Sequence, residues 1–171
     1  MRWKEGYVAA ALVLASTMAT GAECARDFSG EWSREAPASS PDDAYRAEGS
    51  GWSDRIRVAQ AAGRITIESF FYSRGDLQPP LKFSYLPGEG TTGNVIMVGQ
   101  GAQRQISTAR WSDCRLTITT RFPAGGDASP EGNVTQTLWL ESATTLVVET
   151  SRGGANPNRT VYRKVAVAGG T

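Results

Sequence analysis

Residues 115–122 are the segment that most constrains how this chain can fold. Its sequence, Arg-Leu-Thr-Ile-Thr-Thr-Arg-Phe, places large or β-branched residues at the even positions and arginine or threonine at the odd ones. Successive side chains of a β-strand point to opposite faces, so this period of two predicts a strand with one buried face and one solvated face. Residues 111–113, just before it, are expected to form a turn.

The same alternation recurs along most of the chain. Ile56 and Val58 alternate with arginines, and the tight connection at 61–63 leads to Ile65 and Ile67, which predicts a hairpin. Further strands are expected at 81–85, 95–98, 134–140, 144–150 and 159–167, and another is centred on Ile106 and runs from the turn at 99–101 up to Trp111. A meander of this many strands avoids open edges by curling round. The sequence therefore predicts an all-β fold, an antiparallel up-and-down barrel of about eight to ten strands.

The start of the chain is typical of a secretory signal peptide. Arg2 and Lys4 precede an apolar run, and small residues follow it up to Ala22. The apolar run is well short of the roughly 20 residues that span a bilayer, so no transmembrane segment is expected once it is cleaved. We expect a signal peptide at 1–22, a barrel domain at 23–167, a disordered tail at 168–171, and an exported protein, periplasmic or secreted.

Cys24 and Cys114 are the two cysteines of the chain. In an exported protein, two cysteines most simply form one disulfide. Closing a loop of about 90 residues stabilises by roughly 3–5 kcal/mol when judged by chain entropy. The alternative, a reactive thiol, needs a neighbouring base, and the chain contains no histidine.

The charges and residue types exclude several functions. The chain has 18 basic and 17 acidic residues and no basic run of five or more, so nucleic-acid binding and electrostatic membrane docking are not expected. The absence of histidine excludes Ser-His-Asp and Cys-His catalysis and any histidine metal site. Glu68 and Glu149 are strand-borne carboxylates, but each is expected on the outer face. We predict no catalytic residue, metal or cofactor.

Two short motifs lie at the ends of the predicted barrel. Phe-Ser-Gly-Glu-Trp at 28–32 opens the first strand, and Val-Tyr-Arg-Lys at 161–164 lies in the last. The first motif resembles the Gly-x-Trp start of lipocalins and fatty-acid-binding proteins, the calycin group, and the pair resembles small exported bacterial proteins. The resemblance implies that Trp32, after Gly30, plugs one end of the barrel and that Arg163 or Lys164 lies over its face. A guanidinium or ammonium group is attracted to the face of an indole ring.

The segment 34–53 is the point where the chain departs from a typical lipocalin. Ser-Pro-Asp-Asp at 40–43 fits the start of a short helix over 41–48, with plain loop as the alternative. A segment of this length resembles the helical lid that fatty-acid-binding proteins insert between their first two strands. A lipocalin-like barrel with a short helix or lid is therefore expected.

The interior of a small barrel either fills with side chains or leaves room for one small molecule. Alternation assigns to the interior the residues Ile67, Phe83, Tyr85, Ile106, Arg110, Ile118, Leu138 and Val148. The leading hypothesis is a binding protein for a small apolar or amphipathic ligand. The alternatives are a solid interaction module that contacts a protein of the cell envelope, and a barrel-pocket isomerase or cyclase. An enzyme is the least favoured of the three.

Overall fold

The fold is described from a computed structural model of the chain. It describes residues 26–35, 49–73, 75–88, 90–98, 101–122, 132–153 and 155–166. The predicted signal peptide, the helix expected over 41–48, Cys24 and the tail after 167 lie outside these residues. Within the described residues there is no helix long and apolar enough to cross a membrane.

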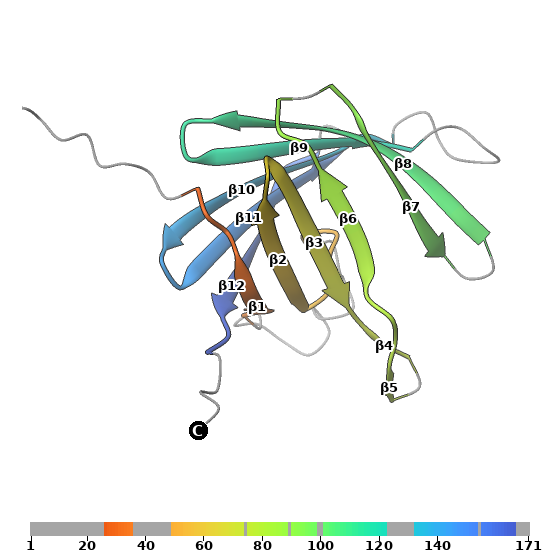
Figure 1. Ribbon diagram of the computed structural model, residues 1–171, viewed down its shortest axis with the longest axis horizontal. Helices are drawn as coiled ribbons and strands as arrows, with labels where there is room; N and C mark the ends of the chain where they lie inside the picture. Colours follow the sequence, from red (N-terminus) through yellow and green to blue (C-terminus); the bar gives the residue numbers. More distant parts are fainter. Residues whose placement is uncertain are drawn as a thin grey trace, which may run out of the picture.

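The described chain is a succession of antiparallel strands (Figure 1). The strands are β1 (Gly30–Arg34), β2 (Arg55–Ala61), β3 (Arg64–Phe70), β4 (Tyr72–Ser73), β5 (Asp76–Leu77), β6 (Leu81–Tyr85), β7 (Thr92–Val98), β8 (Gly101–Ser112), β9 (Arg115–Arg121), β10 (Val134–Ser142), β11 (Thr145–Arg152) and β12 (Asn158–Lys164). Ten of them form one sheet in the order β6-β3-β2-β1-β12-β11-β10-β9-β8-β7, and β4 and β5 form a separate ribbon. The predicted all-β, up-and-down antiparallel barrel is confirmed.

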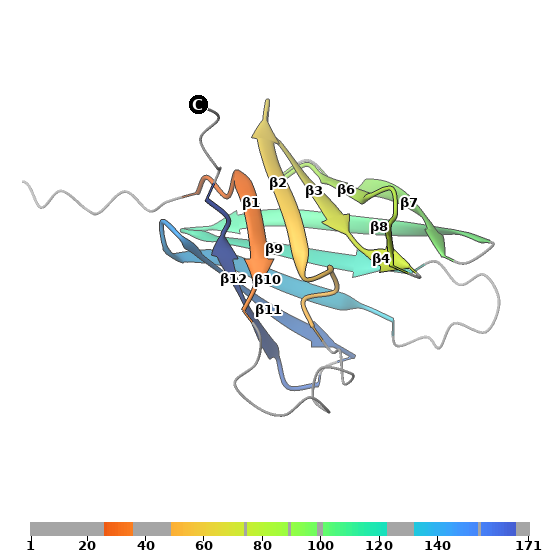
Figure 2. The same cartoon turned by 90° about the horizontal axis from the view of Figure 1, so that it is seen from below.

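The first and last strands of the barrel lie side by side. In the antiparallel pairing of β1 with β12, Trp32 is opposite Lys164 and Arg34 is opposite Tyr162. Figure 2 shows the sheet curving round from this pair toward β6 and β7. A meander becomes a barrel when its first and last strands pair with each other.

The barrel is nearly closed, and its seam lies between β6 and β7. These strands stand at the two ends of the sheet order. Asn94 of β7 bridges them, because its Oδ1 accepts from the Ser84 amide at 2.7 Å and its Nδ2 donates to the Ser84 carbonyl at 3.1 Å. The Leu86 amide also donates to the Thr92 hydroxyl at 3.2 Å. Side chains thus replace part of the missing backbone ladder.

The turns explain how the hairpins are joined. Ala62 and Gly63 connect β2 to β3 with φ values of 49° and 74°, the positive values that a two-residue hairpin turn with the twist of the sheet requires. At the end of β8 the strand continues through Ser112, opposite Arg115. The turn therefore lies at 113–114, later than the 111–113 expected from the sequence.

The core occupies the inner face of the sheet. Its fully buried apolar side chains are Phe28, Trp32, Ile56, Ile67, Leu116, Ile118, Leu138, Leu146 and Val148. The Trp32 indole N–H donates to the Phe28 carbonyl at 2.9 Å, so its one polar group is satisfied inside this core.

Candidate ligand-binding cavity

The segment from Gly49 to Asp54, which leads into β2, is fastened to the barrel interior. The Ser50 and Tyr162 hydroxyls are 2.6 Å apart, and both residues are buried. The Tyr162 hydroxyl also donates to the Ser53 carbonyl at 3.0 Å. From β10, the Gln136 amide donates to the Ser50 carbonyl. These bonds hold the segment against the interior.

Trp52 is the large side chain that this segment turns inward. It is buried, and its indole N–H bonds the hydroxyl of Tyr85 on β6. Burial raises the pKa of Tyr85 well above that of a free tyrosine, and the bond from Trp52 offsets only part of this rise. Tyr85 therefore remains a neutral hydroxyl and does not act as a base near neutral pH.

A cavity of about 210 Å³ lies between this segment and the inner faces of the strands. It is lined by Gly51, Trp52, Leu81, Phe83, Tyr85, Ile96, Gln105, Thr120, Phe122, Val134, Gln136 and Arg152. Most of the lining is apolar or aromatic, with a few polar groups, which is the usual composition of a small-molecule site. Among these lining residues there is no carboxylate.

The polar side chains of the cavity differ in whether they are already hydrogen-bonded, and Gln136 is engaged by the Ser50 carbonyl. The Thr120 hydroxyl is already occupied by Ser107, 2.8 Å away. Gln105 is buried, and its amide makes no hydrogen bond within the described part of the chain. Half-buried Arg152 makes one long contact, 3.5 Å from its guanidinium to the Gly49 carbonyl, and forms no ion pair with any described carboxylate. The amide and the guanidinium are thus available to a ligand.

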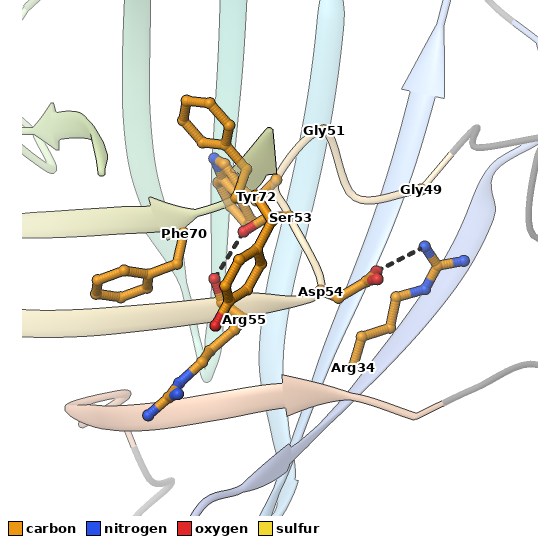
Figure 3. Close-up of a pocket in the computed structure, with 10 residues that line it drawn as sticks. Arg34, Gly49, Gly51, Ser53, Asp54, Arg55, Phe70 and Tyr72 are labelled. Carbon is orange, nitrogen blue, oxygen red and sulfur yellow. Dashed lines mark hydrogen bonds and ion pairs between the residues drawn. The ribbon is translucent and has the colours of Figure 1, made fainter. Parts of the chain in front are cut away.

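A second hollow, of about 640 Å³, lies on the outer side of the same segment (Figure 3). Phe70, Phe71 and Tyr72 line it, and Arg34 pairs with Asp54 at 3.2 Å on its far wall. Gly51 and Trp52 line both this outer hollow and the internal cavity. The segment is therefore a thin wall between the interior and the surface.

The structure separates the eight residues that were expected to face the lumen. Ile67, Phe83, Tyr85, Ile118, Leu138 and Val148 lie in the buried core. Of these six, Phe83 and Tyr85 line the cavity. The other four belong to the packed part of the interior. Alternation predicts which face of the sheet a residue occupies but not its height along the barrel axis. It therefore does not tell which of the inward-facing residues line the cavity.

Ile106 and Arg110 have the opposite orientation to the expected one. In β8, Gln105, Ser107 and Ala109 are buried, while Ile106 is half-buried and Arg110 is exposed. Ile106 is opposite Arg121 of β9, so both lie on the outer face. Two of the three buried residues of this strand are polar, so apolar residues do not mark its inner face. Its single isoleucine was therefore assigned to the wrong face.

The two basic residues at the end of the last strand have different contacts. Lys164 lies over Trp32, with Nζ 5.3 Å from the ring centre. Arg163 faces outward and pairs with Glu35 at 3.0 Å and with the Thr145 hydroxyl at 2.7 Å. Of the two basic residues, Lys164 therefore covers the indole.

The structure describes the chain from Arg26, two residues after Cys24, and the turn that contains Cys114. Arg26 donates to the Asp113 carbonyl at 2.7 Å and lies over Trp111, 5.7 Å from the ring centre. Phe28 packs against the same indole, with ring centres 5.3 Å apart. The chain two residues after Cys24 is thus held beside the turn that contains Cys114. Because Cys24 lies outside the described residues, the pairing stays a prediction.

Ten of the twelve cavity residues were not among the ligand contacts predicted from the sequence: Gly51, Trp52, Leu81, Ile96, Gln105, Thr120, Phe122, Val134, Gln136 and Arg152. For three of them the signal was present. Thr120 is two residues from Ile118, Gln136 is two from Leu138, and Arg152 is four from Val148, so each shares the inner face of its strand. Trp52 precedes its strand, and Gln105 lies on the strand whose parity was misread.

The structure also places the two strand-borne carboxylates named in the sequence analysis. Glu68 faces outward and pairs with Arg57 at 3.4 Å and with Lys82 at 2.8 Å. Glu149 lies opposite Arg159 on the outer face of β11 and β12. No group of three or more potential metal ligands occurs in the part of the chain that the structure covers.

Comparisons with known proteins concern the fold. No protein-family model and no curated protein matches the sequence. Among solved structures, the chain is similar to secretory abundant heat soluble protein 4 from Ramazzottius varieornatus, with a TM-score of 0.55 and 10% identity over 84% of this chain and 98% of that chain. It also matches a point mutant of the REP1-NXSQ fatty acid transporter, with a TM-score of 0.49 and 12% identity over 82% of this chain and 100% of that chain. The first likeness supports a lipocalin-like barrel.

Proposed function

We propose that this protein is an exported barrel that binds one small amphipathic molecule in the internal cavity. The observation that carries the proposal is the meeting of an apolar wall with two available polar groups, Gln105 and Arg152. A ligand with a polar end could accept hydrogen bonds from the Gln105 amide and the Arg152 guanidinium while the apolar wall removes the rest of the molecule from water.

The volume limits the size of the ligand. A cavity of about 150 Å³ is enough for benzene. One of about 210 Å³ therefore suits a molecule with roughly ten non-hydrogen atoms, such as a medium-chain or arylalkyl acid. A long-chain fatty acid exceeds it. The arginine at the rim favours a carboxylate at the polar end of the ligand.

The experiment is a titration followed by the indole N–H resonances in NMR, with octanoate, octan-1-ol and palmitate as probes. We expect octanoate to bind and to shift the Trp52 signal, octan-1-ol to bind more weakly, and palmitate to bind least. R152Q should lower the affinity for octanoate about tenfold, in line with the loss of one charge-assisted hydrogen bond, and leave octan-1-ol unchanged. R64Q, which removes an arginine from the outer face of β3, is the matched control.

Native mass spectrometry of protein purified from its own host is the complementary measurement. A co-purified molecule in the expected size range supports the proposal. Protein that arrives empty and shifts no indole signal with any of the three probes contradicts it. The favoured interpretation is then the interaction module, which the densely filled core around Trp32 also suits.

Export and the disulfide form one linked part of the proposal. We expect the mature protein to begin at Glu23 and to contain the bond between Cys24 and Cys114. The contact between Arg26 and Asp113 supports this pairing by holding the two cysteine segments together. Intact mass and non-reducing peptide mapping of protein from its host test both points. Retention of residues 1–22, or thiols that react freely with iodoacetamide in the folded protein, would contradict them.

A further inference from the structure

Charges are arranged differently on two parts of the outer barrel surface. On β1, β2, β3 and β6, opposite charges face each other across the strands. Arg57 is opposite both Glu31 and Glu68 in the ladders and contacts them at 2.5 and 3.4 Å. Lys82 contacts Glu68 at 2.8 Å. This part of the surface is electrically compensated.

The outer face of β8 and β9 has no such compensation. It presents four exposed arginines, Arg104, Arg110, Arg115 and Arg121. None of the four forms an ion pair within the described chain, and Arg115 lies over the Trp139 ring at 4.2 Å. The four do not form a basic run in the sequence: alternation places Arg115 and Arg121 on the outer face of β9, and the register of β8 with β9 adds Arg104 and Arg110 to the same side. In the ladders none of the four is directly opposite another, and all are exposed, so together they form a positively charged surface that attracts anionic partners.

Exposed aliphatic side chains lie next to this basic face. Val95 and Met97 of β7 are 66% and 62% exposed. Val95 is opposite Arg104 and Met97 is opposite Ala102, so they point to the same outer side. Figures 1 and 2 show that β7 and β8 extend away from β1 and β12. The projecting hairpin thus combines apolar side chains with arginine.

A groove of about 450 Å³ crosses the same face. Thr108, Thr119 and Arg121 supply hydroxyl and guanidinium donors to it, and Ile106 and Phe122 supply apolar wall. Donors of this kind suit a phosphate group that carries an apolar chain. Phe122 also lines the internal cavity, so the groove and the proposed ligand site share this residue.

We propose that this face docks the protein on a bilayer that contains anionic phospholipid. The arginines meet the headgroups, a phosphate enters the groove, and Val95 and Met97 enter the apolar boundary. A single-stranded nucleic acid is a poorer fit, because it needs exposed aromatic rings for stacking and the hairpin exposes aliphatic ones. Docking in this way would place Phe122, which the groove and the cavity share, close to the membrane, but it does not depend on the ligand proposal.

The test is co-sedimentation of the purified protein with vesicles of phosphatidylcholine alone and with a quarter of phosphatidylglycerol. We expect binding to the anionic vesicles only, weakening with salt. R121Q should lower the partition coefficient about fivefold and R104Q/R121Q about twenty-fivefold, given the contribution of one basic residue near an anionic surface. V95S/M97S should lower it without changing the salt dependence.

The matched control is R64Q, which removes the same charge from the exposed outer face of β3. It should change the partition coefficient less than twofold, and circular dichroism should show that all variants remain folded. Equal loss with R64Q and R121Q, binding to neutral vesicles to the same extent, or binding to a single-stranded oligonucleotide but not to vesicles would each overturn the proposal.

Discussion

Lys164, the last residue of β12, lies over the ring of Trp32 in β1, with its Nζ 5.3 Å from the ring centre. The contact joins the first and last strands where the chain closes on itself, because the two residues are directly opposite in the ladder. The ammonium group is attracted to the indole face, and the lysine stem covers apolar surface. The position of Lys164 also explains why Gly30, two residues before Trp32, is a glycine.

Gly30 is predicted to be intolerant of alanine. A Cβ there would come within 2.8 Å of Lys164 Cε, and φ is +140°, a value that other residues rarely adopt. We expect G30A to lower the free energy of unfolding by about 2 kcal/mol, measured by urea denaturation. K164A in the same background should recover part of this loss. If G30A is as stable as the parent protein, the close approach is wrong.

Asn94 is predicted to hold the seam between β6 and β7. N94A removes both bonds to the Ser84 backbone, and we expect a loss of about 2 kcal/mol and faster hydrogen exchange at the Ser84 amide. T92V removes the single bond to Leu86 and should have a smaller effect. Unchanged protection of the Ser84 amide in N94A would show that the seam closes by other means.

Thr150 and Thr120 form a matched pair for the cost of a buried hydroxyl. Thr150 is 2% exposed, and its Oγ1 has no partner among the described residues, whereas Thr120, 5% exposed, bonds Ser107. We expect T150V to raise the free energy of unfolding by about 1 kcal/mol and T120V to lower it by about the same amount. Chemical denaturation of both variants measures this, and effects of the same sign would contradict the assignment.

Glu31 is predicted to contribute to acid unfolding. Hydrogen bonds from Arg55, which has the larger effect, and from Arg57 hold the pKa of Glu31 below its usual range. The folded state therefore keeps this carboxylate charged at a pH where the unfolded chain binds a proton. Its contribution to stability is present above the unfolded pKa of about 4.3 and is lost as the pH falls through the lower, folded value.

The measurement is the urea midpoint at pH 6 and at pH 3. E31Q should lose less stability between these values than the parent protein. E149Q, which removes a strand-borne carboxylate that makes no ion pair with described residues, serves as the control and should follow the parent protein. A parent and an E31Q variant with equal pH dependence would show that the arginine contacts do not persist in solution.

The sequence by itself determined the fold class of this protein. Period-two alternation in segments such as 115–122 fixes which residues of a strand share a face, and short turns such as Ala62–Gly63 force neighbouring strands to pair. The Gly-x-Trp start and the basic end of the chain indicated which two strands meet. These are local properties, so they can be read along the chain.

The tertiary structure decided where the cavity lies and which charges gather. Ile106 faces outward because the register sets it opposite Arg121, and the same register brings Arg104 and Arg110 of β8 to the side of Arg115 and Arg121. Trp52 enters the interior because Ser50, Tyr162 and Tyr85 fasten its segment there. Register and long-range hydrogen bonds depend on strands far apart in the sequence, so alternation within one strand does not specify them.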